Sequence, residues 1–558
     1  MPSEWIPKPG EWPIDPQEDV PIQDSRVWID GCFDFSHHGH AGAMLQARRL
    51  GTELVVGVHS DEAILENKGP TVMTLDERMA AVCANRWTTF AVPRAPYVTS
   101  LPWISHYGCR YVVHGDDITS DAGGEDCYRF VKKAGRFKVV KRTPSISTTD
   151  LVGRMLLCTR SHFLRDFEAC IAAVLPEIQH PSKDVTKEVI VEDAAMVKEP
   201  EPTAPEEDDA VVAERKRRGE EMMARFRDYA TDQTGVQPGV EVWMWRGGEQ
   251  DKHRRPSMSR RRTSGLSRRH SSGAGDSSRN NTQVSGEHDG SHHHHHHHHH
   301  TEHRHKHSSS KETNMPSELF SRMVEGKRPR PGQRIVYVDG GFDLFSSGHI
   351  EFLRLVTETE EKAAREQGWY EGDSLKAQLD ELGEPYDPFY VVVGVHGDEV
   401  INRWKGVNYP VMNIFERALC ALQCKYVHAM VLLAPYTPSD RFLKTFPFSN
   451  MAKQPEPPDV VYHGPTSFLP HPPTFDTYAA AKALGIYNEI PEHPYSHVNA
   501  GEIVNRILKG REAYEARQKK KGEKGMVEDA VKRREELERE AEAERERRRK
   551  EVEGQFGV

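Results

Sequence analysis

An internal repeat is the feature that most constrains the fold, because it requires the same structural unit to be built twice. The segment Val27 to His40 reads VWIDGCFDFSHHGH, and Ile335 to His349 reads IVYVDGGFDLFSSGH. Further on, VVGVHSDE at 55–62 returns as VVVGVHGDE at 391–399. Since a chain of 558 residues is too long for one hydrophobic core, the repeat predicts two tandem domains of one fold.

Strand-like and helix-like segments alternate through the first copy, from Arg26 to about Arg154. Short runs of β-branched and aromatic residues predict strands at 27–29, 53–59, 90–92, 111–113 and 137–140. Helical patterns separate them, and one begins with a capping box at 74–77. This alternation predicts an α/β fold with a parallel sheet, whose ligands bind at the carboxyl ends of the strands.

A glycine turn between two histidines follows the first predicted strand. His37 and His40 flank Gly39, and apolar residues at helical spacing come next. The free amides and positive dipole at a helix start favour an anion, and Gly39 lets the backbone approach it closely. Two imidazoles beside such a site suit phosphoryl or nucleotidyl transfer, where catalysis rests on positioning and electrostatics.

This turn and three later segments, in the same order, resemble the signatures of the cytidylyltransferase family within the HxGH nucleotidyltransferase superfamily. The later segments are ENKGP at 66–70, HGDDI at 114–118 and RTPSISTT at 142–149. The resemblance implies two tandem Rossmann-like nucleotidyltransferase domains with parallel sheets. It also implies transfer of CMP from CTP to the phosphate of a small acceptor, with release of pyrophosphate.

The same resemblance implies roles for individual residues. His37, His40 and Lys68 would be catalytic. The residues expected to bind CTP are Cys32, Phe33, His40, Lys68, His114, Gly115, Asp116, Asp117, Arg142, Ser147, Thr148 and Thr149. The residues expected to bind the acceptor, whose ammonium group needs a carboxylate or an aromatic face, are Asp30, Asp34, Tyr97 and Asp116. Mg²⁺ would enter with the nucleotide, and we expect no metal site made of protein ligands.

Some of these residue types have simpler explanations, and one position departs from the family pattern. Serine and threonine at a helix start serve as an N-cap without any ligand, and an aspartate at a strand end often caps a turn. Ser145 stands where the family signature has glycine, so the backbone of the 142–149 loop would be strained if that glycine has a positive φ.

The tandem arrangement bears on the acceptor. Within the resembled family, two such domains in one chain separate the members that act on phosphoethanolamine from those that act on phosphocholine. Phosphocholine or glycerol 3-phosphate as acceptor, ATP as nucleotide, and a non-catalytic scaffold stay open as alternatives. The second copy has Ser346 in place of the first histidine, and 493–499 carries no RTxGxSTT signature, so we expect it to be inactive.

Composition excludes several other classes of protein. The net charge of −10 gives no general attraction to nucleic acid, and no apolar stretch is long enough to span a membrane, so we expect at most peripheral membrane association. The 8 cysteines include no C-x-x-C pair, which argues against a zinc site or a disulfide framework. The acidic, proline-rich opening does not resemble a signal peptide, and we expect a cytoplasmic protein.

Composition also suggests domain boundaries. We expect a flexible arm at 1–22, a catalytic domain at 23–158, a largely disordered linker at 159–330, a degenerate second domain at 331–510 and a charged, solvated helical tail at 511–558. The linker holds a histidine run at 292–300, and two serines that follow arginines, Ser264 and Ser271, suit a basophilic kinase. A homodimer stays open.

Overall fold

The computed structural model describes residues 20–116, 119–144, 146–157, 162–175, 209–247, 319–406, 409–448, 455–464, 476–517 and 519. All of them belong to the compact unit formed by Met1–Gly248 and Pro316–Val558. Two of the predicted positions, Asp117 and Ser145, lie outside the described residues, as do the 292–300 histidine run and both linker serines.

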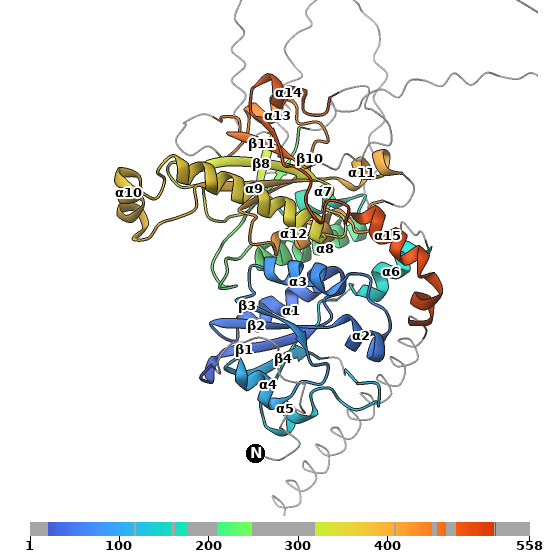
Figure 1. Ribbon diagram of the computed structural model, residues 1–558. Coiled ribbons are helices and arrows are strands. Elements are labelled where there is room, and N and C mark those ends of the chain that lie inside the picture. Colours follow the sequence, from blue (N-terminus) through green and yellow to red (C-terminus); the bar gives the residue numbers. More distant parts are fainter. Residues whose placement is uncertain are drawn as a thin grey trace, which may run out of the picture. The chain divides into compact units, whose positions relative to one another are not determined.

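The first domain is a five-stranded parallel sheet in the order β3-β2-β1-β4-β5, with helices on its faces (Figure 1). Its strands are β1 Gln23–Gly31, β2 Glu53–His59, β3 Phe90–Ala95, β4 Cys109–Gly115 and β5 Phe137–Val140. Its helices are the 3-10 turn η2 Asp34–Ser36, α1 His38–Arg48, α2 Asp61–Lys68, α3 Leu75–Ala84, α4 Leu101–His106, α5 Arg129–Lys133 and α6 Thr148–Leu157.

Several local predictions are confirmed in this domain. Strands β2 and β5 have the predicted bounds, and the other three extend beyond the predicted runs. The predicted capping box is present, because Thr74 Oγ1 accepts from Glu77 N while a Glu77 carboxylate oxygen accepts from Thr74 N. The α/β class with a parallel sheet is therefore correct.

The second domain repeats this architecture and extends it. Its seven-stranded sheet has the order β12-β11-β8-β9-β10-β6-β7, and only β7 runs antiparallel to its neighbour. The strands are β6 Glu241–Trp245, β7 Phe320–Val324, β8 Arg334–Gly340, β9 Phe389–His396, β10 Ala429–Ala434, β11 Val460–His463 and β12 Tyr487–Glu489. The helices are α9 Ser347–Glu366, α10 Gly372–Leu382, α11 Asp398–Lys405, α12 Ile414–Leu422, α13 Asp440–Lys444, α14 Ala479–Ala483 and α15 Ala500–Lys509.

The predicted linker at 159–330 is wrong where the chain is described. It contains helices α7 Phe167–Ala172 and α8 Asp209–Tyr229 as well as strands β6 and β7. The charged surface of α8 obscures a narrow buried stripe that includes Met222, Phe226 and Tyr229. Strand β6 is a run of only five residues, and it is stabilised by pairing with β10, nearly two hundred residues away.

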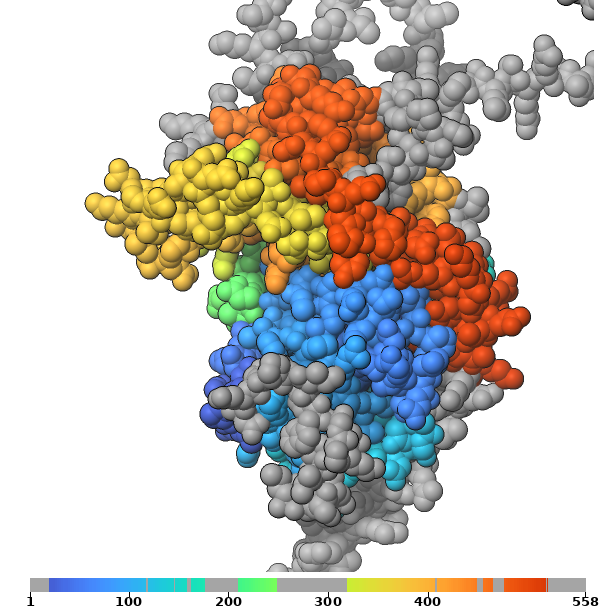
Figure 2. Space-filling view, viewed as in Figure 1, coloured from blue at the N-terminus to red at the C-terminus, as the bar shows by residue number. Residues whose placement is uncertain are grey.

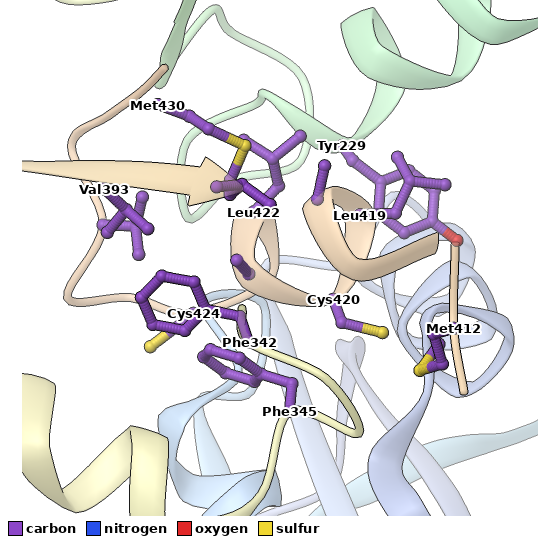
Figure 3. Close-up of a cluster of buried hydrophobic side chains, with 14 of the residues drawn as sticks. Tyr229, Phe342, Phe345, Val393, Met412, Leu419, Cys420, Leu422, Cys424 and Met430 are labelled. Atoms are coloured by element: carbon purple, nitrogen blue, oxygen red, sulfur yellow. The ribbon is translucent and has the colours of Figure 1, made fainter. Parts of the chain in front are cut away.

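One hydrophobic core continues from the first domain into the second. Its buried residues include Phe35 and Leu151 of the first domain, Tyr229 of α8, and Leu419 and Cys420 of α12. Figure 3 shows Tyr229 beside Leu419 of α12, with Cys420 on another side of the same helix and further side chains of the second domain around it. The two domains therefore share buried apolar surface.

Two reciprocal ion pairs link the domains. Arg154 of α6 forms a bidentate ion pair with Glu416 of α12, with nitrogen-to-oxygen distances of 2.7 and 2.8 Å. Arg506 of α15 makes the same contact with Glu77 of α3, at 2.8 and 2.9 Å. In each pair the glutamate is also the capping-box residue of its own helix, so each domain supplies the arginine that neutralises a capping glutamate in the other.

Candidate active site

The turn between β1 and α1 brings the two predicted catalytic histidines together. His37 is the N-cap of α1, and its Nδ1 accepts a hydrogen bond from Gly39 N at 3.1 Å. The His37 and His40 rings stack with centroids 3.9 Å apart and planes 18° from parallel. His37 therefore serves as a helix cap and as one half of an imidazole pair at the start of α1.

Packing within the protein requires glycine at position 39, and its predicted approach to an anion stays a prediction. A Cβ at this position would lie 2.8 Å from Ile146 Cγ2 and 2.9 Å from the His37 ring. The absence of a side chain therefore lets the His37 ring and the 142–149 loop pack against the turn. Phe33, at φ 55°, places its ring 5.5 Å from His40 in an edge contact.

His38, between the two, is a structural residue. Burial lowers the pKa of its imidazole to about 3, so it is neutral at physiological pH. Its carbonyl accepts a hydrogen bond from Tyr229 of α8 at 2.5 Å. Nearby, Gln423 of the second domain donates to the Ser36 carbonyl at 2.9 Å. The histidine turn is thus supported by α8 and by the second domain.

Lys68 is the last residue of α2, and Gly69 ends that helix with φ 93°. The Lys68 ammonium lies 5.6 Å from the centre of the Tyr97 ring. Its charge also acts to lower the pKa of the Cys32 thiol, although burial dominates and raises that pKa to about 11. Lys68, Tyr97 and Cys32 are therefore neighbours at the carboxyl ends of the strands.

Asp34 connects three parts of the site. Its carboxylate accepts from Val72 N at 3.1 and 3.2 Å and from Met73 N at 2.9 Å, which fixes the loop after Lys68. Its carbonyl accepts from Thr148 Oγ1, in the first turn of α6, at 3.4 Å. Burial raises the pKa of Asp34. The structure thus gives Asp34 a positioning role.

Asp30 lies in a second buried network. Its carboxylate accepts from Trp28 Nε1 at 2.8 Å, from Thr99 Oγ1 at 2.5 Å and from the Tyr128 hydroxyl at 2.7 Å. The Tyr128 ring lies 4.6 Å from that of His114, which belongs to β4. The network joins Asp30 to His114 and fixes a buried carboxylate near the strand ends.

The remaining predicted residues surround this edge of the sheet. Ser147 Oγ accepts from Asp150 N at 3.0 Å and so caps α6, which begins with Thr148 and the half-buried Thr149. Gly115 ends β4, while Asp116 and Arg142 are exposed to solvent. The starts of α1 and α6 thus both lie at the predicted site, and each offers backbone amides to an anion.

Sequence reasoning assigned no role to Arg78, whose side chain is fully buried. Its guanidinium donates to the carbonyls of Cys32, His59 and Met73 and pairs with Asp61 at 2.6 Å. Arg78 therefore fixes the ends of β1 and β2 relative to the lysine loop. The repeated dipeptide Glu-Arg, at 77–78 and again at 416–417, was the available signal.

The equivalent turn of the second domain is built differently. Ser346 caps α9, its hydroxyl donates to the Val498 carbonyl at 2.6 Å, and its amide donates to His349 Nδ1 at 3.1 Å. Burial lowers the pKa of His349 to about 3. The His349 ring stacks on Phe345 with centroids 5.9 Å apart, so its ring partner is a phenyl group and not a second imidazole.

In the part of the chain that the structure describes, no group of three or more His, Cys, Asp or Glu side chains could hold a metal ion. Within the same residues, no helix is long and apolar enough to cross a membrane.

Comparison with known proteins gives matches over the first domain and over nearly the whole chain. A protein-family model described as cytidylyltransferase-like matches residues 28–154. Ethanolamine-phosphate cytidylyltransferase of Mus musculus is 32% identical over 502 residues, covering 90% of this chain and 90% of that protein. The protein of the same name from Dictyostelium discoideum is 31% identical over 497 residues, covering 89% of this chain and 94% of that protein. Choline-phosphate cytidylyltransferase A of Rattus norvegicus is 41% identical over 133 residues, but covers only 24% of this chain and 36% of that protein.

Proposed function

Because the chain belongs to the ethanolamine-phosphate cytidylyltransferase family, we propose that its first domain transfers CMP from CTP to phosphoethanolamine. The products are CDP-ethanolamine, an intermediate in phosphatidylethanolamine biosynthesis, and pyrophosphate. The stacked pair of His37 and His40, at the start of α1, is the observation that carries the proposal.

In the proposed reaction a phosphate oxygen of phosphoethanolamine attacks the α-phosphorus of CTP in line. One P–O bond forms, and the bond from the α-phosphorus to the oxygen bridging to the β-phosphate breaks, so that pyrophosphate leaves with that electron pair. No covalent enzyme intermediate is needed. Negative charge accumulates on the oxygens of the α-phosphate and on the leaving group, and the site must stabilise both.

The histidine pair supplies donors for the α-phosphate. His37 Nδ1 accepts a hydrogen bond from Gly39 N. In the neutral ring the single proton is therefore on Nε2, and this N–H can donate to the phosphate. Lys68, next to the Gly69 turn, holds the same phosphate group. The α6 start at Ser147, Thr148 and Thr149, with Arg142, receives the pyrophosphate.

We assign the acceptor's ammonium group to Asp30 and Tyr97. Asp30 is a buried carboxylate held by three donors, and Tyr97 already faces one cation, the ammonium of Lys68. Asp34 instead positions the lysine loop, since its carboxylate accepts from two of the loop's amides. Asp116, which is exposed, remains a candidate for the edge of this subsite.

The family implies a magnesium ion, and the residues present fit one that enters with the nucleotide. Both buried aspartates near the site, Asp30 and Asp34, accept hydrogen bonds from protein donors. The phosphate oxygens of CTP would therefore be the main ligands. When bound, Mg²⁺ neutralises triphosphate charge.

The test is pyrophosphate release from CTP or ATP with phosphoethanolamine, phosphocholine or glycerol 3-phosphate as acceptor. We expect turnover with CTP and a preference for phosphoethanolamine. We expect His40→Ala to lower kcat by about 100-fold or more, as the loss of one transition-state donor does. A preference for another acceptor, or His40→Ala activity equal to wild type, would contradict the proposal.

We also propose a cytoplasmic location and phosphorylation of Ser264 and Ser271 by a basophilic kinase. The lack of C-x-x-C pairs, which argues against a disulfide framework, supports the cytoplasmic location. The arginines before each serine support the phosphorylation. Cell fractionation that places the protein in another compartment would contradict the first. Intact-mass analysis of protein from cells that finds neither serine phosphorylated would contradict the second. A homodimer stays a prediction.

A further inference from the structure

The segment that follows α15 packs against the first domain. Residues 511–517 are helical, and Tyr514 within them is only 6% exposed. Figures 1 and 2 show this C-terminal segment, coloured red, against the first domain, coloured blue. The expectation of a solvated tail from 511 onward is therefore wrong for these residues, because Tyr514 supplies apolar surface that the charge pattern hid.

The C-terminal segment contacts the lysine loop of the candidate active site. The Tyr514 hydroxyl donates to the Thr71 carbonyl at 3.0 Å, and Arg517 Nη1 donates to the Pro70 carbonyl at 2.5 Å. The stem of Arg517 lies beside Gly69, since a Cβ on that glycine would lie 3.5 Å from three carbons of the arginine. The contacts begin one residue after Lys68.

Arg517 also brings a positive charge into the site. Its Nη1 lies 3.6 Å from Asp34 Oδ2, and both side chains are largely buried, at 18% and 1% exposed. This charge opposes the burial that raises the pKa of Asp34, and it also acts to lower the pKa of Cys32 and of Tyr97. The guanidinium thus lies among predicted site residues although it comes from the far end of the chain.

The lysine loop is consequently held from two sides. The Asp34 carboxylate accepts from the amides of Val72 and Met73, and the C-terminal segment donates to the carbonyls of Pro70 and Thr71. Four consecutive residues after Gly69 are therefore fixed, two through their donors and two through their acceptors. The direction in which Lys68 leaves α2 depends on both sets of contacts.

The second domain gives an internal comparison. Its equivalent loop is held by Asp343, which accepts from the amides of Val411 and Met412 at 2.8 and 2.9 Å. The carbonyl of Pro410 accepts from His162 Nε2 at 3.0 Å, and His162 belongs to the segment after α6 of the first domain. Each domain thus sends the segment after its last helix to the other domain's loop, and the Pro70 carbonyl receives an arginine where the Pro410 carbonyl receives a histidine.

We propose that Arg517 is a positioning residue for Lys68, and that the first domain's CTP site is complete only with the C-terminal segment in place. The inference rests on the proposed function, in which Lys68 binds the α-phosphate. Arg517 neutralises Asp34 and holds the Pro70 carbonyl, so it keeps the loop in the geometry that directs Lys68 toward the nucleotide.

The test uses the full-length chain and steady-state kinetics with CTP and phosphoethanolamine. We expect Arg517→Ala to raise KM for CTP by about tenfold while KM for phosphoethanolamine changes by less than about twofold. Arg517→Lys should recover part of the loss, because a cation near Asp34 is retained. Arg511→Ala is the matched control, since Arg511 is on the same helical segment and pairs with Glu515 at the solvent-exposed surface.

A double-mutant cycle separates positioning from general damage. If Arg517 acts through Lys68, adding Arg517→Ala to Lys68→Ala should cause almost no further loss, so the two effects are not additive. Additive losses, an unchanged KM for CTP, or equal rises in both KM values with a lower melting temperature would overturn the inference. Wild-type protein with no turnover would overturn the proposed reaction and this inference together, whereas normal turnover in Arg517→Ala would overturn the inference alone.

Discussion

At the residue scale, some side chains in this protein have two roles at once. His37 caps α1 through Nδ1, and the same hydrogen bond leaves the proton on Nε2 of the neutral ring. Glu77 caps α3 and also receives Arg506 from the other domain. A substitution at either position therefore removes two interactions at once, and its effect cannot be assigned to one of them without a second variant.

His38 gives a prediction about pH. Its pKa falls from 6.5 to about 3 on folding because the imidazole is buried. Between these values the unfolded chain binds a proton that the folded chain does not, so the free energy of unfolding falls as pH drops below about 6.5. The contribution approaches about 1.4 kcal/mol per pH unit. Urea unfolding at several pH values should give a shallower dependence for His38→Gln than for the wild type.

The matched control for this pH series is His497→Gln, at an exposed position. It measures what a histidine-to-glutamine change at the surface does to the free energy of unfolding. Parallel curves for His38→Gln and the wild type between pH 4 and 6.5 would contradict the assignment of a buried neutral imidazole at position 38.

At the element scale, the two copies of the strand-turn-helix unit have diverged at the turn. In the first copy α1 begins with two stacked imidazoles, and in the second α9 begins with a serine whose hydroxyl bonds to the Val498 carbonyl. The remaining histidine, His349, is buried and neutral. The second turn therefore has the geometry of a helix cap, and only the first presents an imidazole pair.

This contrast predicts different consequences for the same substitution in the two turns. We expect His349→Ala to leave kcat within about twofold of wild type, because it removes no transition-state donor. His40→Ala in the first turn should lower kcat by about 100-fold. Kinetics should be measured well below each variant's melting temperature, since His349 also supports the α9 start. An equal loss of kcat in both variants would show that the second turn takes part in the reaction.

Which elements could be predicted from the sequence depended on how local their determinants are. Strands β2 and β5 were recognised because each is a short segment rich in valine with other apolar residues, and α3 because its capping box lies within four residues. Strand β6 was not, since its stability comes from pairing with β10 and β7. The histidine pair was found from spacing alone, whereas Arg78 donates to the nearby Met73 carbonyl and to carbonyls of two more distant segments, which no spacing rule connects.

At the scale of the whole molecule, the two domains depend on each other for burial and for charge. Their hydrophobic core is continuous, and each supplies an arginine to the other's capping-box glutamate. The first half of the chain also contributes β6 to the second domain's sheet, between β10 and β7. Removing either half would expose apolar surface and leave a buried carboxylate without its partner.

Division of the chain tests this dependence. We expect the fragments 1–248 and 316–558, which together omit the unit Glu249–Met315, to assemble and turn over CTP when they are co-expressed. Fragment 1–248 alone should aggregate, because β6 loses both neighbours and the shared core is opened. Size-exclusion chromatography and pyrophosphate release would check both expectations. A monomeric fragment 1–248 with wild-type turnover would contradict the dependence.

The reciprocal ion pairs carry a consequence for how a duplicated protein can diverge. After a duplication, a copy that loses its catalytic groups can accept other residues at those positions, and the second domain has a serine at 346 where the first has an imidazole. Glu416 and Arg506 differ from that serine, because their side chains pair with Arg154 and Glu77 of the first domain. The second domain therefore has a structural role in the first domain's folding, separate from any chemistry of its own.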